Sequence, residues 1–133
     1  MKVKCVSNML TSEQQNILEG TLKHPDWFST ITPEKEYTIL GITFVKDSNY
    51  MNGVTLEICS DVDMIETVPI CLFEIIDTRA SQYWSVQFKD NTFSLWPKEF
   101  YKEFFHDDLT EGIPEIVQIF KCIVGRMERE FVN

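Results

Sequence analysis

The chain has 133 residues, of which 44% are hydrophobic, and it carries 21 Asp and Glu against 12 Lys and Arg. That hydrophobic content is enough for one packed core, so it excludes an intrinsically disordered chain, and the length fits a single domain. The formal net charge of −9 argues against nucleic acid and anionic membranes as ligands, because both are bound through basic patches. An acidic chain suits a basic protein partner, although its charge can equally serve solubility alone.

The four cysteines are Cys5, Cys59, Cys71 and Cys122, and none of them belongs to a C-x-x-C pair. Neither a zinc knuckle nor a thioredoxin-like site is therefore indicated. The first ten residues lack the apolar run of a signal peptide, and no window is long enough to span a bilayer. We therefore expect a cytoplasmic protein with reduced thiols, in which Cys71 and Cys122 are small core residues.

The N-terminal segment predicts a strand followed by a short helix. Residues 2–7 alternate between apolar and polar side chains, which is typical of a strand. Thr11 and Gln14 have the spacing of a capping box, and the apolar residues after them, up to Leu22, share one helical face. Pro25 should end this helix.

Three strands are predicted in the middle of the chain. Residues 36–45 are rich in β-branched and aromatic side chains, with Gly41 marking a bulge or bend. Residues 54–61 alternate between apolar and polar side chains. Residues 68–77 are almost entirely apolar and predict a buried strand, in which Glu74 should face outward or lie at a sheet edge.

A hairpin and two helices are predicted in the last third. The segments "QYWSVQF" and "FSLW" flank "KDNT", which is a hairpin signal. Pro97 suits the first turn of a helix over residues 98–106, and Pro114 starts a second helix whose apolar residues keep a 3.6-residue period to the C-terminus.

These elements predict one α+β domain over residues 1–133. The connections between strands are too short for helical crossovers, so the strands should be antiparallel. We expect one antiparallel sheet or a small, partly open, SH3-like barrel. One N-terminal helix and two C-terminal helices should pack against it.

Acidic residues are concentrated in two intervals without bases. No Lys or Arg lies between Lys46 and Arg79, or between Lys102 and Lys121. If both intervals fold onto one side, they form a negative docking surface; the alternative is a set of solvated turns. The acids that we expect to contact a partner are Asp61, Asp63, Glu66, Asp107, Asp108 and Glu111.

A metal-dependent enzyme is the principal alternative to a binding protein. His106, Asp107 and Asp108, with Glu111, offer imidazole and carboxylate ligands. Adjacent helical residues point about 100° apart, so these three converge on one ion only in an irregular turn. The D-x-D pair at 61–63 lacks the Gly and Glu of an EF-hand loop and is more typical of a hairpin turn. No nucleophile motif or phosphate-binding glycine loop is present, and we expect no cofactor.

Aromatic side chains provide a second set of candidate binding residues. Trp84 and Trp96 lie in or beside the predicted hairpin, next to Tyr83 and Tyr101. Trp and Tyr are enriched at interface hot spots, but both also fill cores, and for each tryptophan alone the core is favoured. A general protein-interaction module with an aromatic groove is therefore a further possibility.

The segments "EYTILGI", "VPICLFEIID", "YWSV", "LWPKEFY" and "FHDDLTEGIPE" together resemble small acidic cytosolic immunity proteins, which bacteria encode beside polymorphic or contact-dependent toxins. The resemblance covers most of residues 36–115. It implies a non-catalytic inhibitor that binds and neutralises one cognate toxin, often a nuclease with a basic active site. No functional residue carries over from this resemblance, because no diagnostic motif accompanies it.

The stretch "FFHDDLTEG" predicts a junction between two helices. Phe104 and Phe105 should make the last core contacts of the first helix. Asp108 and Glu111 have capping-box spacing, and Pro114 opens the next helix.

Overall fold

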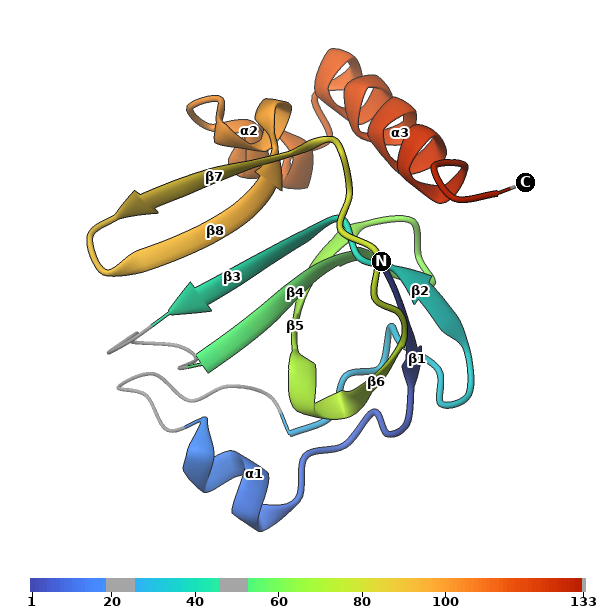
Figure 1. Ribbon diagram of the computed structural model, residues 1–133. Coiled ribbons are helices and arrows are strands. Elements are labelled where there is room, and N and C mark those ends of the chain that lie inside the picture. The colour runs from blue at the N-terminus through green and yellow to red at the C-terminus, as the bar shows by residue number, and fades with distance from the viewer. Residues whose placement is uncertain (19–25, 46–52, 133) are drawn as a thin grey trace.

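The computed structural model describes residues 1–18, 26–45 and 53–132, and eight strands of this part form two antiparallel sheets (Figure 1). One sheet has the order β2-β1-β6 and the other the order β5-β4-β3-β8-β7. The predicted α+β class with antiparallel pairing is thus confirmed. In chain order the strands are β1 (Lys2–Cys5), β2 (Glu36–Thr38), β3 (Gly41–Val45), β4 (Gly53–Cys59), β5 (Ile65–Pro69), β6 (Phe73–Asp77), β7 (Trp84–Lys89) and β8 (Thr92–Pro97).

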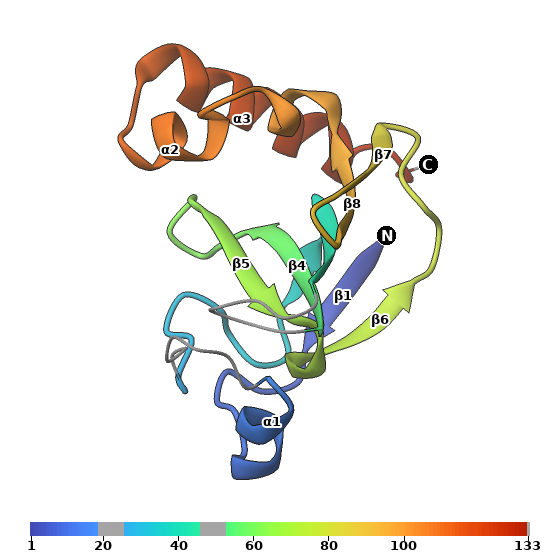
Figure 2. The same ribbon diagram turned by 90° about the vertical axis from the view of Figure 1, so that its left-hand side faces the viewer.

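The helices lie at opposite ends of the molecule. Figure 2 shows α2 (Phe105–Thr110) and α3 (Pro114–Glu128) above the sheets, with α1 (Ser12–Ile17) below them. Two short 3₁₀ turns, η1 (Ile70–Leu72) and η2 (Lys98–Tyr101), connect strands to their neighbours. One N-terminal and two C-terminal helices are therefore present, as predicted.

In the described part of the chain the strands form two sheets and not the predicted single sheet, and they do not close into a barrel. Two segments that were predicted as continuous strands are interrupted, and this divides the strands between two sheets. Residues 36–45 do not form one strand, because the chain leaves the three-stranded sheet after Thr38 and enters the five-stranded sheet at Gly41. It returns at η1, which separates β5 from β6. Each break moves the chain from one sheet to the other.

The prediction of one buried strand over residues 68–77 was wrong. The 3₁₀ turn η1 interrupts the segment, and β6 is an edge strand with Ile75 and Ile76 partly exposed. Glu74 is exposed on this edge, as predicted. Cys71 is exposed rather than in the core, because it lies in the turn, and Cys122 is exposed on the outer side of α3.

The buried hydrophobic residues of the described ranges form two clusters. The first lies between the sheets and includes Val3, Leu56 and Val68, all fully buried. The second lies beneath α2 and α3 and is built around Phe100 and Phe120. In α3, the residues on the predicted apolar face are buried at intervals of three or four positions: Ile116, Phe120, Ile123 and Met127.

A close backbone contact fixes the start of β3. A Cβ atom added at Gly41 would lie 2.6 Å from Cδ1 of Trp96 and 3.3 Å from the carbonyl oxygen of Leu95. Only glycine leaves room for the Trp96 ring at this position. The bend predicted from Gly41 therefore has a packing cause, and it coincides with the break between β2 and β3.

Two local predictions near turns are confirmed. The side chain of Thr11 accepts from the backbone N–H of Gln14 and the Gln14 side chain accepts from Thr11, which completes the capping box of α1. Strands β7 and β8 form the predicted hairpin, with Asp90 and Asn91 both at positive φ. That geometry is typical of a type I′ turn. The predicted continuation of this helix to Leu22 and its predicted end at Pro25 lie outside the described residues.

The prediction of a single helix over residues 98–106 was wrong. The 3₁₀ turn η2 ends at Tyr101, and α2 starts only at Phe105. Between them Phe104 adopts φ of 64°, and its side chain is 62% exposed. Phe105 is buried as predicted, whereas Phe104 makes no core contact of the kind expected.

The junction at 108–113 is a helix C-terminus and not a capping box. Gly112 has φ of 76°, its N–H donates to the carbonyl of Leu109, and the N–H of Ile113 donates to the carbonyl of Asp108. These two bonds define a Schellman motif that ends α2. Asp108 is therefore inside α2 and Glu111 is its C-cap residue, while Pro114 begins α3 as predicted.

Candidate functional site

The first acidic interval is partly neutralised by residues from elsewhere in the chain. Asp61 accepts hydrogen bonds from Thr32 Oγ1 at 2.6 Å, Lys35 Nζ at 2.5 Å and Tyr37 Oη at 2.8 Å. Partial desolvation opposes the shift, but the bonds from Lys35, Thr32 and Tyr37 hold the pKa of Asp61 below its usual value. Asp61 thus ties the β4–β5 turn to the segment before β2, and its charge is balanced within the molecule.

Two further acids of this interval are also engaged. Glu57 is buried in β4, where Thr67 Oγ1 donates to both carboxylate oxygens at 3.0 Å. Asp77 forms a two-bond ion pair with Arg79. Of the predicted contact residues in this interval, Asp63 is exposed and Glu66 is half-buried on the edge strand β5. A segment without bases in the sequence therefore does not give a surface without bases.

The predicted contact residues of the second acidic interval lie on α2 and at its C-terminal end. Asp107 and Asp108 stand in the first turn of this helix, where its dipole favours negative charge, and Glu111 is exposed at its end. Asp63 lies elsewhere, beside α3, where it lines a hollow together with Lys121 and Glu128.

His106 is part of an aromatic cluster. Its ring centroid lies 5.2 Å from that of Trp96, 5.4 Å from that of Phe100 and 5.9 Å from that of Phe105. Burial lowers the pKa of His106, and Asp107 opposes this only in part. Within residues 1–18, 26–45 and 53–132, no three His, Cys, Asp or Glu residues are placed to hold a metal ion. The arrangement of His106 favours packing in its neutral form.

The two predicted tryptophans are half-buried and hydrogen-bonded. Trp84 Nε1 donates to the carbonyl of Leu40 at 2.8 Å, and Trp96 Nε1 donates to Thr43 Oγ1 at 2.9 Å. Trp96 also stacks on Tyr101 with the ring centroids 5.0 Å apart. Both indoles pack against the core clusters, so they support the sheet on which the hairpin is built.

The hairpin carries an exposed apolar surface that the sequence analysis did not identify. Strand pairing places Phe88 opposite Phe93, and Phe93 opposite Phe44 of β3. Val86 follows on the same face of β7, since alternate residues of a strand share a face. The exposed fractions are 49% for Phe44, 63% for Val86, 70% for Phe88 and 41% for Phe93. We refer to these four residues as the hairpin face.

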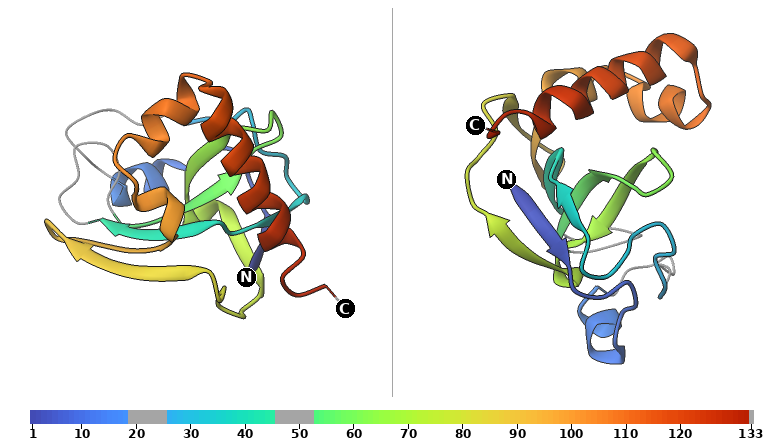
Figure 3. Two further views of the ribbon diagram at one scale, coloured as in Figure 1. Left: turned by 90° about the horizontal axis from the view of Figure 1, so that it is seen from above. Right: turned by 90° about the vertical axis from the view of Figure 1, so that its right-hand side faces the viewer.

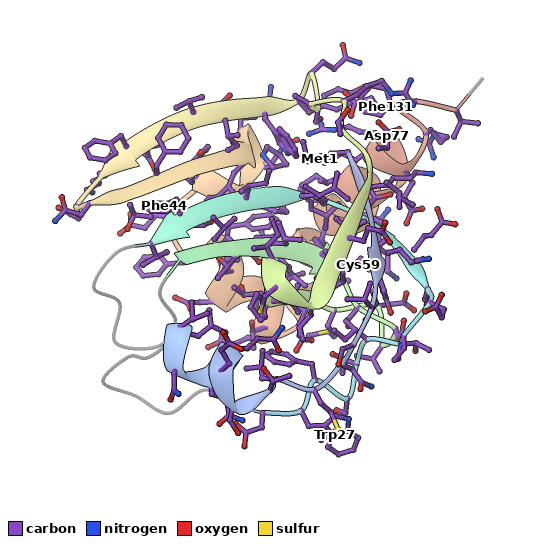
Figure 4. All side chains as sticks on the ribbon, turned by 60° about the horizontal axis from the view of Figure 1, so that its bottom comes forward. Met1, Trp27, Phe44, Cys59, Asp77 and Phe131 are labelled. Atoms are coloured by element: carbon purple, nitrogen blue, oxygen red, sulfur yellow. The ribbon has the colours of Figure 1, made fainter. Side chains whose placement is uncertain are left out.

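The hairpin face continues a core surface into solvent. Ile42, two residues before Phe44 on β3, packs against the cluster between the sheets. Ile42 and Trp84 lie at the border of this cluster, and Phe44, Val86, Phe88 and Phe93 lie outside it. Figure 4 shows Phe44 at the outer end of β3 beside the hairpin, far from Trp27. The apolar alternation of Val86, Phe88 and Phe93 was visible in the sequence, but it resembles that of a core strand.

A polar cleft lies between α3 and β2. Its volume is about 370 Å³, and its lining includes Tyr37, Cys59, Ser60 and Glu128. Burial, together with the charges of Asp63 and Glu128, raises the pKa of Cys59 to about 11. A thiol with such a pKa is protonated at neutral pH and is a poor nucleophile. The cleft therefore offers shape and polarity but no activated nucleophile at Cys59.

The comparisons with known proteins found no relative. No family model matches the chain, and neither a curated protein nor a solved structure shows significant similarity to it. No helix in the described ranges is both long and apolar enough to cross a membrane. Among the surfaces of the described residues, the hairpin face is the most distinctive, because it places four exposed apolar side chains on neighbouring strands.

Proposed function

We propose that this protein is a protein-binding module that docks its partner on the hairpin face. The observation that carries the proposal is the exposure of Phe44, Val86, Phe88 and Phe93 on neighbouring strands. With roughly 200 Å² for a whole phenylalanine, their exposed parts amount to on the order of 400 Å². A contiguous patch of that size matches the largest apolar patch of a typical monomeric protein, which is often a functional surface.

The packing around the hairpin suits a preformed docking surface. Tyr101 Oη donates to the carbonyl of Ser85 at 2.7 Å and lies 3.0 Å from Ser94 Oγ, so it holds β7 and β8 from the opposite side. Trp96 packs between Tyr101 and Phe100. A surface that is held rigid before binding loses little conformational entropy when a partner docks.

The partner that we propose is a basic protein, in particular a toxin that this protein neutralises as a cytoplasmic immunity protein. The net charge of −9 supports a basic partner, and Asp63, Asp107 and Glu111 are exposed acids that can contribute to the field. The resemblance of residues 36–115 to immunity proteins supports the toxin. Neutralisation would require no cofactor, because the inhibitor only has to cover or distort the toxin's active site.

The test uses the protein encoded by the adjacent gene as the candidate partner. Wild-type protein should bind it in a titration and rescue growth of cells that express it. The double variant Phe88→Ser, Phe93→Ser should weaken binding at least tenfold while its thermal midpoint stays near that of the wild type, because both side chains are exposed. Ile17→Ser, at an apolar side chain on α1 that is as exposed as Phe88, is the control and should bind normally.

Two outcomes would count against the proposal. If the double variant binds the candidate partner as tightly as the wild type, the hairpin face is not the docking surface. If a basic protein binds but charge reversal at Asp63, Asp107 and Asp108 leaves the salt dependence of the association rate unchanged, the acidic field has no part in recognition.

A further inference from the structure

Strand β7 has an unpaired outer edge. It is the last strand of the five-stranded sheet, and it forms a border of the molecule in Figure 3. Residues Lys89 and Thr92 flank the two-residue turn and form the closing hydrogen-bonded pair of the hairpin. Because bonded and non-bonded positions alternate along an antiparallel ladder, the N–H and C=O groups of Val86 and Phe88 point away from β8.

No described segment pairs with this edge. Apart from the ladder to β8, the backbone hydrogen bond found for β7 is the one from the Trp84 N–H to the carbonyl of Ser81, at 3.4 Å. In the described part of the chain, the outward backbone groups of Val86 and Phe88 therefore have no partner. Together they offer four hydrogen-bonding groups to another strand.

The other three sheet edges carry acids, whereas β7 does not. Strand β2 has Glu36, β5 has Glu66, and β6 has Glu74 and Asp77. Acidic side chains on an edge disfavour pairing with an identical strand, because like charges would lie close together. From Trp84 to Phe88 there is no charged residue, and the first charge is that of Lys89. β7 is thus the described edge least protected against association with itself.

We propose that the occupant of this edge is β7 of a second copy of the chain, which forms a twofold-symmetric dimer centred on Gln87. In this antiparallel register Val86 lies opposite Phe88 of the second copy, and Gln87 lies opposite Gln87. The four free backbone groups of each copy then bond to their counterparts. Aliphatic–aromatic cross-strand pairs such as Val–Phe are favourable, and Ser85 meets Lys89 without a like-charge contact.

The same register is complementary in charge. It places the exposed Asp90 turn of one copy opposite Trp84 of the other. Trp84 borders a hollow of about 340 Å³ whose lining includes Lys98. Neither Asp90 nor Lys98 forms an ion pair among the described residues. The dimer would bring this acid near this base at both ends of the strand pair.

The dimer is an inference separate from the proposed partner binding. It would enlarge the docking surface, because it joins the hairpin faces of two copies. Strand addition continues one sheet through both copies, so the two hairpin faces meet on the same side of a ten-stranded sheet. Specific interfaces bury about 800 Å² per partner, roughly twice the exposed area of one hairpin face. The merged face of two copies supplies an apolar area of that order.

Cross-linking of the purified protein, with no partner present, tests the register. Gln87→Cys is made in a Cys71→Ser, Cys122→Ser background, since both native thiols are exposed. In a non-bonded antiparallel pair the Cα atoms lie about 4.5 Å apart, within disulfide range. Gln87→Cys should form a covalent dimer at least tenfold faster than Ser85→Cys, whose two copies lie roughly 13 Å apart in this register.

Sedimentation velocity tests the dimer without a cross-link. Wild-type protein should show twice the 15.6 kDa mass of one chain at micromolar concentration. Phe88→Lys should shift it to the monomer mass, whereas Phe104→Lys, at a comparably exposed phenylalanine away from β7, should not. A wild-type protein that stays monomeric up to 100 μM, or equal cross-linking of Gln87→Cys and Ser85→Cys, overturns the proposal while leaving partner binding unaffected.

Discussion

Single buried or crowded residues set the local energetics of this sheet. Glu57 is the clearest case, because its carboxyl group lies in the middle of β4 and, among the described residues, accepts hydrogen bonds only from the Thr67 hydroxyl. Burial raises the pKa of Glu57 to about 7, and the Thr67 hydrogen bond opposes this only in part. The group is therefore largely protonated in the folded protein at mildly acidic pH.

The raised pKa predicts a pH-dependent stability. The contribution of Glu57 to stability is fully present below its unfolded pKa of 4.5 and is lost as the pH rises through about 7. Glu57→Gln removes this loss. The free energy of unfolding of the variant minus that of the wild type should therefore be about 3 kcal/mol larger, meaning a relatively more stable variant, at pH 8 than at pH 4.

Urea denaturation of both proteins at the two pH values measures this difference. Thr67→Val serves as a companion variant, since it removes the Thr67 hydrogen bond to Glu57 and should steepen the pH dependence of the otherwise wild-type protein. An identical stability difference between Glu57→Gln and wild type at pH 4 and pH 8 would mean that Glu57 does not titrate in this range.

Asp61 shows why residue-level charge was hard to anticipate. Its partners Thr32, Lys35 and Tyr37 lie 24 to 29 residues earlier in the chain. The absence of bases between Lys46 and Arg79 is a true property of the sequence, but only the fold brings Lys35 to the β4–β5 turn. Sequence distance and spatial distance differ most in sheets, because strand pairing is nonlocal.

At the level of elements, two glycines should respond in opposite directions to the same substitution. Gly41→Ala should destabilise the protein by about 1–3 kcal/mol, because the new Cβ would overlap the Trp96 ring at the start of β3. Gly125→Ala should stabilise it by about 1 kcal/mol, because alanine favours the interior of α3. The nearest atom there, at 3.1 Å, is the end of the flexible Arg129 side chain.

Chemical denaturation at neutral pH compares the two glycine variants directly. The indole fluorescence of Gly41→Ala should also change, since Trp96 has to move and its bond to Thr43 is affected. If Gly41→Ala is as stable as wild type and its fluorescence is unchanged, Trp96 does not pack closely on Gly41.

Elements with strong local signals were predictable from the sequence. The capping box of α1, the hairpin turn at Asp90–Asn91 and the apolar period of α3 each depend on contacts within a few residues. The crossings between sheets after Thr38 and at η1 were not predictable, because continuous apolar runs at both places are compatible with unbroken strands. The positive φ of Phe104 has no local signal, since phenylalanine rarely adopts it.

At the scale of the whole molecule, the site was the least predictable part. Phe88 and Phe93 have the alternation of core residues, and only the extent of the second sheet shows that nothing in the described chain covers them. Conversely, the predicted Trp84 and Trp96 are held by hydrogen bonds within the fold. A pattern of residue types shows which side chains are apolar, but the layers of the fold determine which of them face solvent.

The net charge of the molecule and the hairpin face should act on different steps of binding. The excess of acids should raise the association rate with a basic partner, and added salt should reduce this effect. The apolar side chains should determine how long the complex lasts. Substitutions on the hairpin face are therefore expected to raise the dissociation rate, and substitutions of exposed acids to lower the association rate.

Hydrogen–deuterium exchange of the protein with and without its bound basic partner tests the docking surface most directly. The amides of residues 84–97 should exchange more slowly in the complex, while those of α1 should be unchanged. Protection confined to segments outside β3, β7 and β8, with residues 84–97 exchanging as in the free protein, would contradict docking on the hairpin face.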